Sequence, residues 1–458
     1  MDRQKHNDLG SEPVGSLLFR LAVPSICAQV VNLLYNIVDR IYIGHIPGIG
    51  ATALTGVGVT FPIIMLIAAF ASLIGMGGAP RASIQMGQGD DGQAEEILGN
   101  CVTALLVISA ALTVLFLLLQ KPLLLWFGAS ADTLPYGLDY LGIYICGTVF
   151  VQFALGLNGF ISAQGRAMVS MLTVVIGAIL NIVLDPLFIF VLGMGVRGAA
   201  LATVLSQAVS AFWVVKFLCG ASTRLRIRKA HLRPRKDVLV PVISLGASPF
   251  VMQSTESLLS ITFNISLQRF GGDLAVGAMT ILTSLMQIVN MPLMGLTAGA
   301  QPIIGFNLGA RHPDRMRKTV KLLTTAAFCY SMLFWLAVQL IPGVLASFFT
   351  DDPALLQFTV WAMRIYFATV FVIAFQNSLQ QSFIALGEAK ISLFLALLRK
   401  IILLIPMILL LPRLISDQVF AVFLAEPVSD FISASVVIIL FRKRFRSIVA
   451  SIRPQAGG

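Results

Sequence analysis

The chain has 458 residues, of which 57% are hydrophobic and only 12% are charged. A soluble domain carries about 25% charged residues, so this chain lacks the charge that a water-facing surface requires. Its five cysteines are scattered and odd in number, which excludes a small disulfide scaffold. The net charge of +11 requires no nucleic-acid partner, because the basic residues follow membrane topology. The composition predicts an integral membrane protein.

Long apolar segments occur along the whole chain. A helix needs about 20 apolar residues to cross a bilayer, and the sequence offers twelve candidate spans. They lie near 17–42, 51–79, 96–119, 134–157, 168–192, 197–218, 238–268, 273–301, 319–341, 354–379, 391–411 and 418–441. The runs are continuously apolar and do not alternate with period two, which excludes an outer-membrane barrel. We expect an all-α polytopic membrane protein with twelve transmembrane helices.

Lysine and arginine gather in alternate loops, and such loops are typically cytoplasmic. The strongest cluster lies midway along the chain and comprises Arg224, Arg226, Arg228, Lys229, Arg233, Arg235 and Lys236. Because the number of spans is even, both termini are predicted to lie on the cytoplasmic side of the plasma (bacterial inner) membrane. The same cluster could instead bind anionic lipid headgroups.

The two halves of the sequence resemble each other at an offset of 222 residues. The matching pairs include Gly77 and Gly299, Pro80 and Pro302, Gly87 and Gly309, and Gly165 and Gly387. Two six-helix lobes with pseudo-two-fold symmetry about the membrane normal are therefore predicted. We expect a tail at 1–14, an N-terminal lobe at 15–218, a basic linker at 219–237, a C-terminal lobe at 238–442 and a tail at 443–458. Such a duplication favours a transporter, with a scaffold or a passive channel as alternatives.

Polar side chains lie at one depth in the predicted N-terminal lobe. At about 1.5 Å per residue, Asp39, Asp185, Thr203 and Tyr140 fall roughly 6 to 11 Å below the outer surface. Asn181 precedes Asp185 by one helical turn and shares its face. Two neighbouring carboxylates that are screened from water should not both stay ionised. These residues are candidates for ion coupling, and a solvated outer rim is the alternative.

The C-terminal lobe has a second charged group within its predicted spans. Glu256, Arg399 and Asp430 all fall about 18 Å from the outer boundary. Glu426 lies one turn before Asp430, so the two carboxylates share a face opposite Arg399 and Lys400. Arg399, Glu426 and Asp430 are predicted to form structural ion pairs. Glu256 is less easily explained by packing and is a further candidate for ion coupling.

Other functional assignments are few. The candidate substrate contacts are Asn158, Gln29, Tyr35 and Glu256. No zinc, phosphate-loop or CxxC motif is present, so we expect no metal, no cofactor other than a coupling ion, and no enzymatic activity. The expected partners are small amphipathic cations and the lipid bilayer, with the protein acting as a monomer and binding no nucleic acid.

Three stretches resemble the multidrug and toxic compound extrusion (MATE) family. They are PSICAQVVNLLYNIVD from Pro24 to Asp39, the segment from Asn181 to Pro186, and GMGVRGAALAT from Gly193 to Thr203. The resemblance covers residues 15 to 442 and is greatest to the MepA-like and DinF-like branch. It implies a secondary active antiporter that exports lipophilic, mostly cationic compounds in exchange for H⁺ or Na⁺. A lipid-linked oligosaccharide flippase is the alternative.

The resemblance also assigns roles to residues. In one branch the aspartate matching Asp39 exchanges hydrogen bonds with four partners, which match Tyr140, Asn181, Asp185 and Thr203, while the proline matching Pro24 bends the first helix. In another branch an aspartate on helix 10 joins the glutamate that matches Glu256 to bind a cation. This chain has only Asn377, Gln380 and Gln381 in that region. The resemblance therefore does not carry a sodium site over to the C-terminal lobe.

Overall fold

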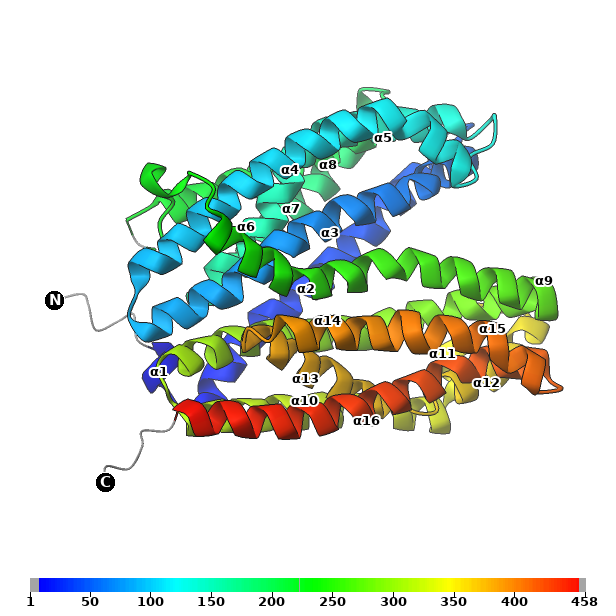
Figure 1. The fold of residues 1–458 in the computed structure, drawn as a ribbon. Coiled ribbons are helices and arrows are strands. Elements are labelled where there is room, and N and C mark those ends of the chain that lie inside the picture. The colour runs from blue at the N-terminus through cyan, green and yellow to red at the C-terminus, as the bar shows by residue number, and fades with distance from the viewer. Residues whose placement is uncertain (1–7, 222, 453–458) are drawn as a thin grey trace.

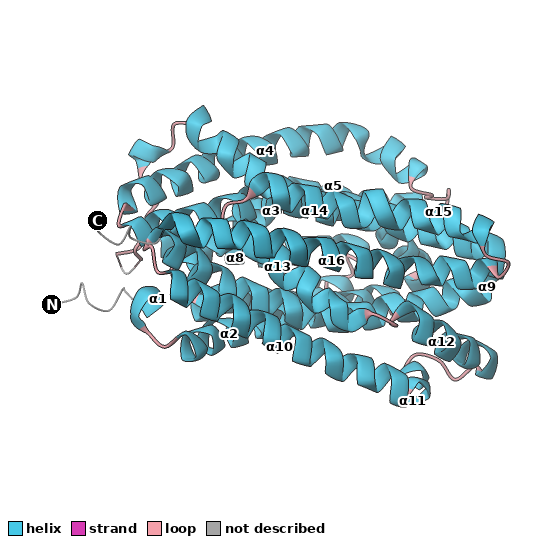
Figure 2. Cartoon of the chain, turned by 60° about the horizontal axis from the view of Figure 1, so that its bottom comes forward, coloured by secondary structure: helices cyan, strands magenta, loops and turns pink. Residues whose placement is uncertain are grey.

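The computed structural model describes residues 8–221 and 223–452, and these residues form helices and loops without any strand (Figures 1 and 2). The outer parts of the two predicted tails, residues 1–7 and 453–458, lie outside the described residues. The first half of the chain consists of α1 (Asp8–Ser11), α2 (Val14–Gly44), α3 (Gly50–Gln88), α4 (Asp91–Trp126), α5 (Leu134–Cys146), α6 (Thr148–Ala163), α7 (Ala167–Pro186), the π-helical turn η2 (Leu187–Val191) and α8 (Val196–Cys219).

The second half follows a linker that contains the 3-10 turn η3 (Lys229–His231). It consists of α9 (Lys236–Gly309), α10 (Pro313–Leu340), α11 (Pro342–Ser347), α12 (Pro353–Tyr366), the 3-10 turn η4 (Val370–Val372), α13 (Ile373–Ala385), α14 (Ala389–Leu397), the π-helical turn η5 (Leu398–Leu404), α15 (Ile405–Leu414) and α16 (Gln418–Ile452). The two halves form two separate groups of helices in Figure 1.

The predicted twelve spans are confirmed once bends and breaks are taken into account. Nine helices in the described part of the chain are individually long and apolar enough to cross a bilayer. Two more spans are bent, by 58° between α5 and α6 and by 45° between α12 and the segment Val370–Ala385. The long α9 contains two spans, because its backbone breaks at Gly272, whose φ of 65° and ψ of −160° are not helical.

The predicted repeat is visible in the positions at which helices begin. Elements of the second half start 222 residues after their counterparts: Val14 and Lys236, Gly50 and Gly272, Asp91 and Pro313, Ala167 and Ala389, Val196 and Gln418. The turns before α7 and α14 also match, since Gly165 and Gly387 have φ values of 78° and 75°. Only glycine adopts this left-handed backbone without strain, which explains why both halves keep glycine there.

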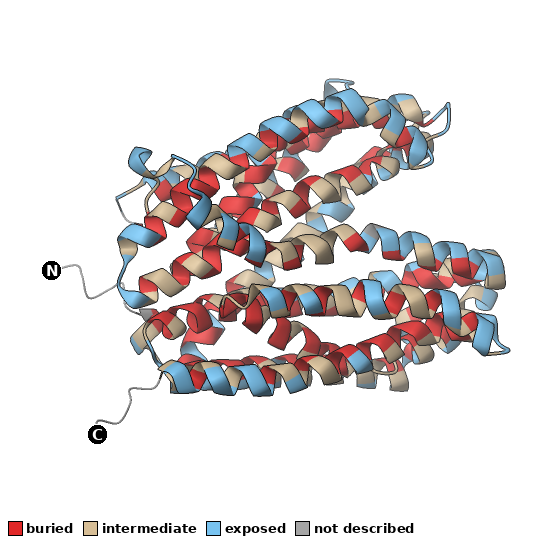
Figure 3. Cartoon of the chain, in the orientation of Figure 1, coloured by how far each residue is buried: buried red, intermediate tan, exposed pale blue. Residues whose placement is uncertain are grey.

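Burial follows the pattern of a protein in lipid. Buried residues lie on the sides of helices that face other helices, while exposed residues lie on the outer sides (Figure 3). Many of the exposed residues are large and apolar, such as Phe19, Leu118 and Trp126, which are 71%, 75% and 79% exposed. A surface of this kind would associate in water, and it is the surface expected against acyl chains.

The two lobes meet at the end that carries α1 and the C-terminal end of α16 (Figure 1). Glycines permit this close approach: a Cβ at Gly246 of α9 would lie 1.7 Å from the carbonyl oxygen of Leu73 in α3. Leu9 of α1 is buried at the same end, and its carbonyl oxygen accepts hydrogen bonds from the side chains of Asn307 and Arg315. The short α1 therefore packs on the second half of the chain.

The basic linker packs against the start of α4. Arg224 pairs with Asp91 at 2.7 Å, Arg235 pairs with Glu96 at 2.7 Å, and Arg228 pairs with Glu95. These three arginines thus bind carboxylates of the protein itself. The last helix runs on to Ile452, ten residues past the predicted lobe end at 442, because Phe445, Ile448 and Ile452 continue its apolar face.

Candidate functional site

Four helices of the first half bring the predicted coupling residues together. Asp39 of α2 lies beside Asp185 of α7, near enough for their carboxyl groups to share a hydrogen bond when one of them holds a proton. Asp185 is fully buried, and each carboxyl group has one buried oxygen without a hydrogen-bond partner. No lysine or arginine pairs with either group among the described ion pairs, so this carboxyl pair carries an acidic charge without a basic partner.

Neutral side chains continue this network into α8 and α5. The Asn181 amide donates to Asp185 Oδ1 at 3.2 Å and to Thr203 Oγ1 at 3.4 Å. Thr203 in turn forms a hydrogen bond with Tyr140. Asn181 and Tyr140 are 2% and 4% exposed. The five predicted members of this group therefore form one connected cluster, although their role in coupling stays a prediction.

Two features of α2 bear on how this cluster could change. Tyr35 lies one turn before Asp39 on the same helix face and near both carboxyl groups. Pro24 lies in the middle of α2, where it cannot donate a hydrogen bond to the turn before it. In this structure α2 continues through Pro24 as one helix from Val14 to Gly44. The weakened position allows a bend, and its function as a hinge stays a prediction.

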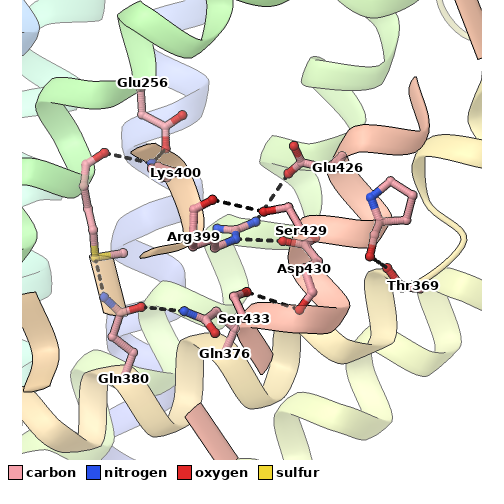
Figure 4. A network of polar contacts seen from close by, with 12 residues as sticks. Glu256, Thr369, Gln376, Gln380, Arg399, Lys400, Glu426, Ser429, Asp430 and Ser433 are labelled. Atoms are coloured by element: carbon pink, nitrogen blue, oxygen red, sulfur yellow. Dashed lines mark hydrogen bonds and ion pairs between the residues drawn. The ribbon is translucent and has the colours of Figure 1, made fainter. Parts of the chain in front are cut away.

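The second half holds the predicted ion-pair network in its interior (Figure 4). Arg399 pairs with Asp430 at 2.7 Å and with Glu426 at 3.4 Å. The two carboxylates are 4% and 7% exposed, and Ser429 donates to the Arg399 carbonyl oxygen at 3.0 Å. A buried arginine that bridges two carboxylates of one helix holds α16 against η5.

The structure adds a contact that we did not assign from the sequence. Lys400 forms an ion pair with Glu256 and also donates to the Met252 carbonyl oxygen at 2.8 Å. In Figure 4 the side chains of Arg399 and Lys400 leave the backbone in different directions, toward α16 and toward α9. Both residues lie in the π-helical turn η5, a backbone form that is frequent at functional sites. Adjacent charges in the sequence gave no sign of this divergence.

The predicted substrate contacts do not form one cluster. Gln29 and Tyr35 lie on α2, whereas Asn158 lies on α6 and donates to the Ser170 carbonyl oxygen at 3.3 Å. Glu256 lies on α9 with Lys400. No hydrogen bond joins these four residues to one another in the described structure, so their role in binding stays a prediction.

A metal-binding role has no support from the geometry. Within residues 8–221 and 223–452, no group of three or more histidine, cysteine, aspartate or glutamate side chains is placed to hold a metal ion. The chemistry that the two clusters can perform is the exchange of protons and of ionic partners.

Comparison with known proteins identifies relatives over nearly the whole length. The model of the MatE family matches residues 24–187 and 249–410. The multidrug export protein MepA of Staphylococcus haemolyticus is 23% identical over 426 residues, which is 92% of each chain. MepA of Staphylococcus aureus strain MRSA252 is 23% identical over 443 residues, covering 94% of this chain and 95% of that protein.

Solved structures share the fold. A crystal structure of MATE in complex with MaD3S has a TM-score of 0.90 at 23% identity and covers 97% of this chain and 99% of its own. An outward-facing multidrug resistance transporter of the same family also has a TM-score of 0.90 at 23% identity, with 97% and 98% coverage. The arrangement of helices is therefore shared, while the identity is too low to transfer individual residues.

Proposed function

Because this chain belongs to the MATE family of multidrug efflux transporters, we propose that it is a secondary active antiporter. It exports lipophilic, mostly cationic compounds and takes up H⁺ or Na⁺ in exchange. The protein lies in the plasma membrane with both termini in the cytoplasm, and it works as a monomer. The basic linker and α1 then lie at the cytoplasmic end, where the two lobes meet.

The Asp39 and Asp185 pair carries this proposal. Buried carboxyl groups in a membrane protein are expensive and mark functional sites. Here two of them adjoin each other and have an amide and hydroxyls as neighbours. Such a pair can hold a proton or accept a cation, and it cannot do both equally well.

This competition supplies the coupling that antiport needs. A cationic substrate gains electrostatic energy from the ionised pair and loses that gain once the pair is protonated. A ligand can shift a conformational equilibrium only through such differential affinity. Protonation also changes which hydrogen bonds Asn181 and Thr203 make, and Pro24 permits α2 to adopt a second shape.

Acidic character at this depth favours cations over anionic headgroups, which a lipid-linked oligosaccharide flippase would have to bind. A flippase would benefit from basic residues at the same place. The deep cluster of the first half instead holds two carboxyl groups among neutral partners. The cation exporter is therefore the better supported function.

Vesicle transport tests the proposal. Purified protein would be reconstituted into liposomes, or inside-out vesicles prepared from expressing cells, and uptake of a fluorescent lipophilic cation followed. We expect uptake to depend on an imposed pH or sodium gradient. Uptake that ignores both gradients would refute antiport, and flipping of a labelled oligosaccharide lipid without cation uptake would favour the alternative.

A further inference from the structure

The ion pair of Glu256 and Lys400 joins two residues with very different surroundings. The Lys400 side chain is 6% exposed, whereas the Glu256 side chain is 65% exposed. Lys400 Nζ contacts one carboxylate oxygen, Glu256 Oε1, and the Met252 carbonyl oxygen. The ammonium group is thus enclosed by protein oxygens, while its carboxylate partner remains open on one side.

The open side of Glu256 lies next to the contact between the lobes. Gln253 is three residues before Glu256 on α9, so the two share a helix face. Gln253 accepts a hydrogen bond at 3.0 Å from Ser72 of α3, and Phe250 packs on Phe70 of α3 with ring centroids 4.9 Å apart. Glu256 therefore lies about one turn beyond the point where α9 touches the first lobe, and a carboxylate at membrane depth requires water or a cation there.

The charges of this network do not balance. Three carboxylates (Glu256, Glu426 and Asp430) share two cations (Arg399 and Lys400) among the described ion pairs. Glu426 and Asp430 are buried and held by Arg399. The excess negative charge is therefore accessible only at Glu256, and one monovalent cation would neutralise it.

The neighbouring helix offers amides where a second carboxylate could have stood. Gln380 of α13 donates to the Met252 sulfur at 3.2 Å and accepts from Gln376 at 2.9 Å. An amide of this kind adds no negative charge to hold a second small cation beside Lys400. The oxygens of Glu256 and Met252 that a small ion would use already bind the ammonium group.

We propose that Lys400 is a tethered cation that determines the specificity of this site. Its ammonium group occupies the enclosed side of Glu256 and excludes small inorganic cations such as Na⁺, while the exposed side receives a larger organic cation. This inference deepens the proposed function, on which it rests for the class of substrate. A built-in competitor of this type achieves specificity by excluding the wrong ligand.

Exposure also predicts how the two partners respond to substitution. Lys400→Met removes an enclosed charge and leaves Glu256 with access to water, so the protein should still fold. Glu256→Gln leaves an enclosed ammonium without its carboxylate, which is destabilising. The double variant Glu256→Gln/Lys400→Met removes both charges and should regain the stability that Glu256→Gln loses.

The test measures binding by the full-length protein in detergent, without transport. Sodium binding is followed as the shift of the thermal unfolding midpoint in NaCl against choline chloride at equal ionic strength. Binding of tetraphenylphosphonium is measured by equilibrium dialysis. We expect no sodium shift for the natural protein, a clear upward shift for Lys400→Met, and tetraphenylphosphonium binding at least about tenfold tighter in that variant.

The matched control is Lys390→Met, which removes an exposed lysine from α14, the helix that precedes η5. It should behave like the natural protein in both measurements, and the double variant should show no sodium shift. Failure of Lys400→Met to fold, or unchanged sodium and tetraphenylphosphonium binding in it, would overturn the inference. Because no gradient is involved, this result is independent of whether the protein performs antiport.

Discussion

Replacement of Arg399 by methionine tests whether the ion pairs of the second lobe are essential for its stability. Methionine keeps much of the side-chain length and removes the charge. Glu426 and Asp430, which are 7% and 4% exposed, would then be buried without a cation at 3.4 and 2.7 Å. Breaking a buried pair by removing one partner is destabilising by about 3 to 5 kcal/mol.

The effect is large enough to measure as a melting shift. For a lobe of roughly 200 residues, each kcal/mol moves the midpoint by about 2 to 4 °C, so Arg399→Met should melt about 6 to 20 °C lower. Thermal unfolding of the purified protein in detergent is the assay.

The control is Arg197→Met, which breaks an ion pair of similar length with Asp139. Its side chains are 64% and 36% exposed, so the change should be at most about 1 kcal/mol. A triple variant that combines Arg399→Met with Glu426→Gln and Asp430→Asn should recover stability, because it leaves no unpaired charge. If Arg399→Met melted at the same temperature as Arg197→Met, burial would not be what makes the network matter.

Three further predictions concern coupling, orientation and the contact between the lobes. Asp39→Asn and Asp185→Asn should each abolish gradient-driven efflux in vesicles while the melting midpoint is retained, and wild-type transport by both variants would move coupling elsewhere. A cysteine introduced at position 230 in the linker should be shielded from an impermeant thiol reagent in intact cells, whereas one in the loop between α11 and α12 should react. Gly246→Leu should lower the melting midpoint, because its Cβ would lie 1.7 Å from a main-chain oxygen, while Gly15→Leu, with open space around it, should not.

The scaffold was predictable because it depends on properties that a single residue reveals. Apolar length predicts a span, and a glycine that permits close approach recurs wherever the repeat needs one. Gly77 and Gly299 illustrate this, since each lies against a helix of the opposite lobe, Gly77 near Val242 and Gly299 near Ala22. The bend at Gly147 was not predicted, because apolar composition is the same in a bent helix pair and a straight one.

The sites were only partly predictable because they depend on direction as well as depth. Depth along a helix follows from residue number, and it grouped Asp39 with Asp185 and Arg399 with Asp430. Direction at η5 does not follow from residue number, since a π-helical turn rotates successive side chains away from their α-helical positions. The pairing of Lys400 with Glu256 therefore required the structure.

Duplication of the backbone without duplication of the chemistry separates the roles of the two lobes. At the offset of 222 residues, Asp39 and Asp185 correspond to Ile261 and Met407, while Glu256 and Lys400 correspond to Leu34 and Ala178. No member of either pair has a charged counterpart in the other half. The first lobe keeps two carboxyl groups without a cation, so a proton can change its charge. The second lobe keeps its carboxylates with built-in cations. We therefore expect a change of pH to act through the first lobe, while the second lobe selects which cation is bound.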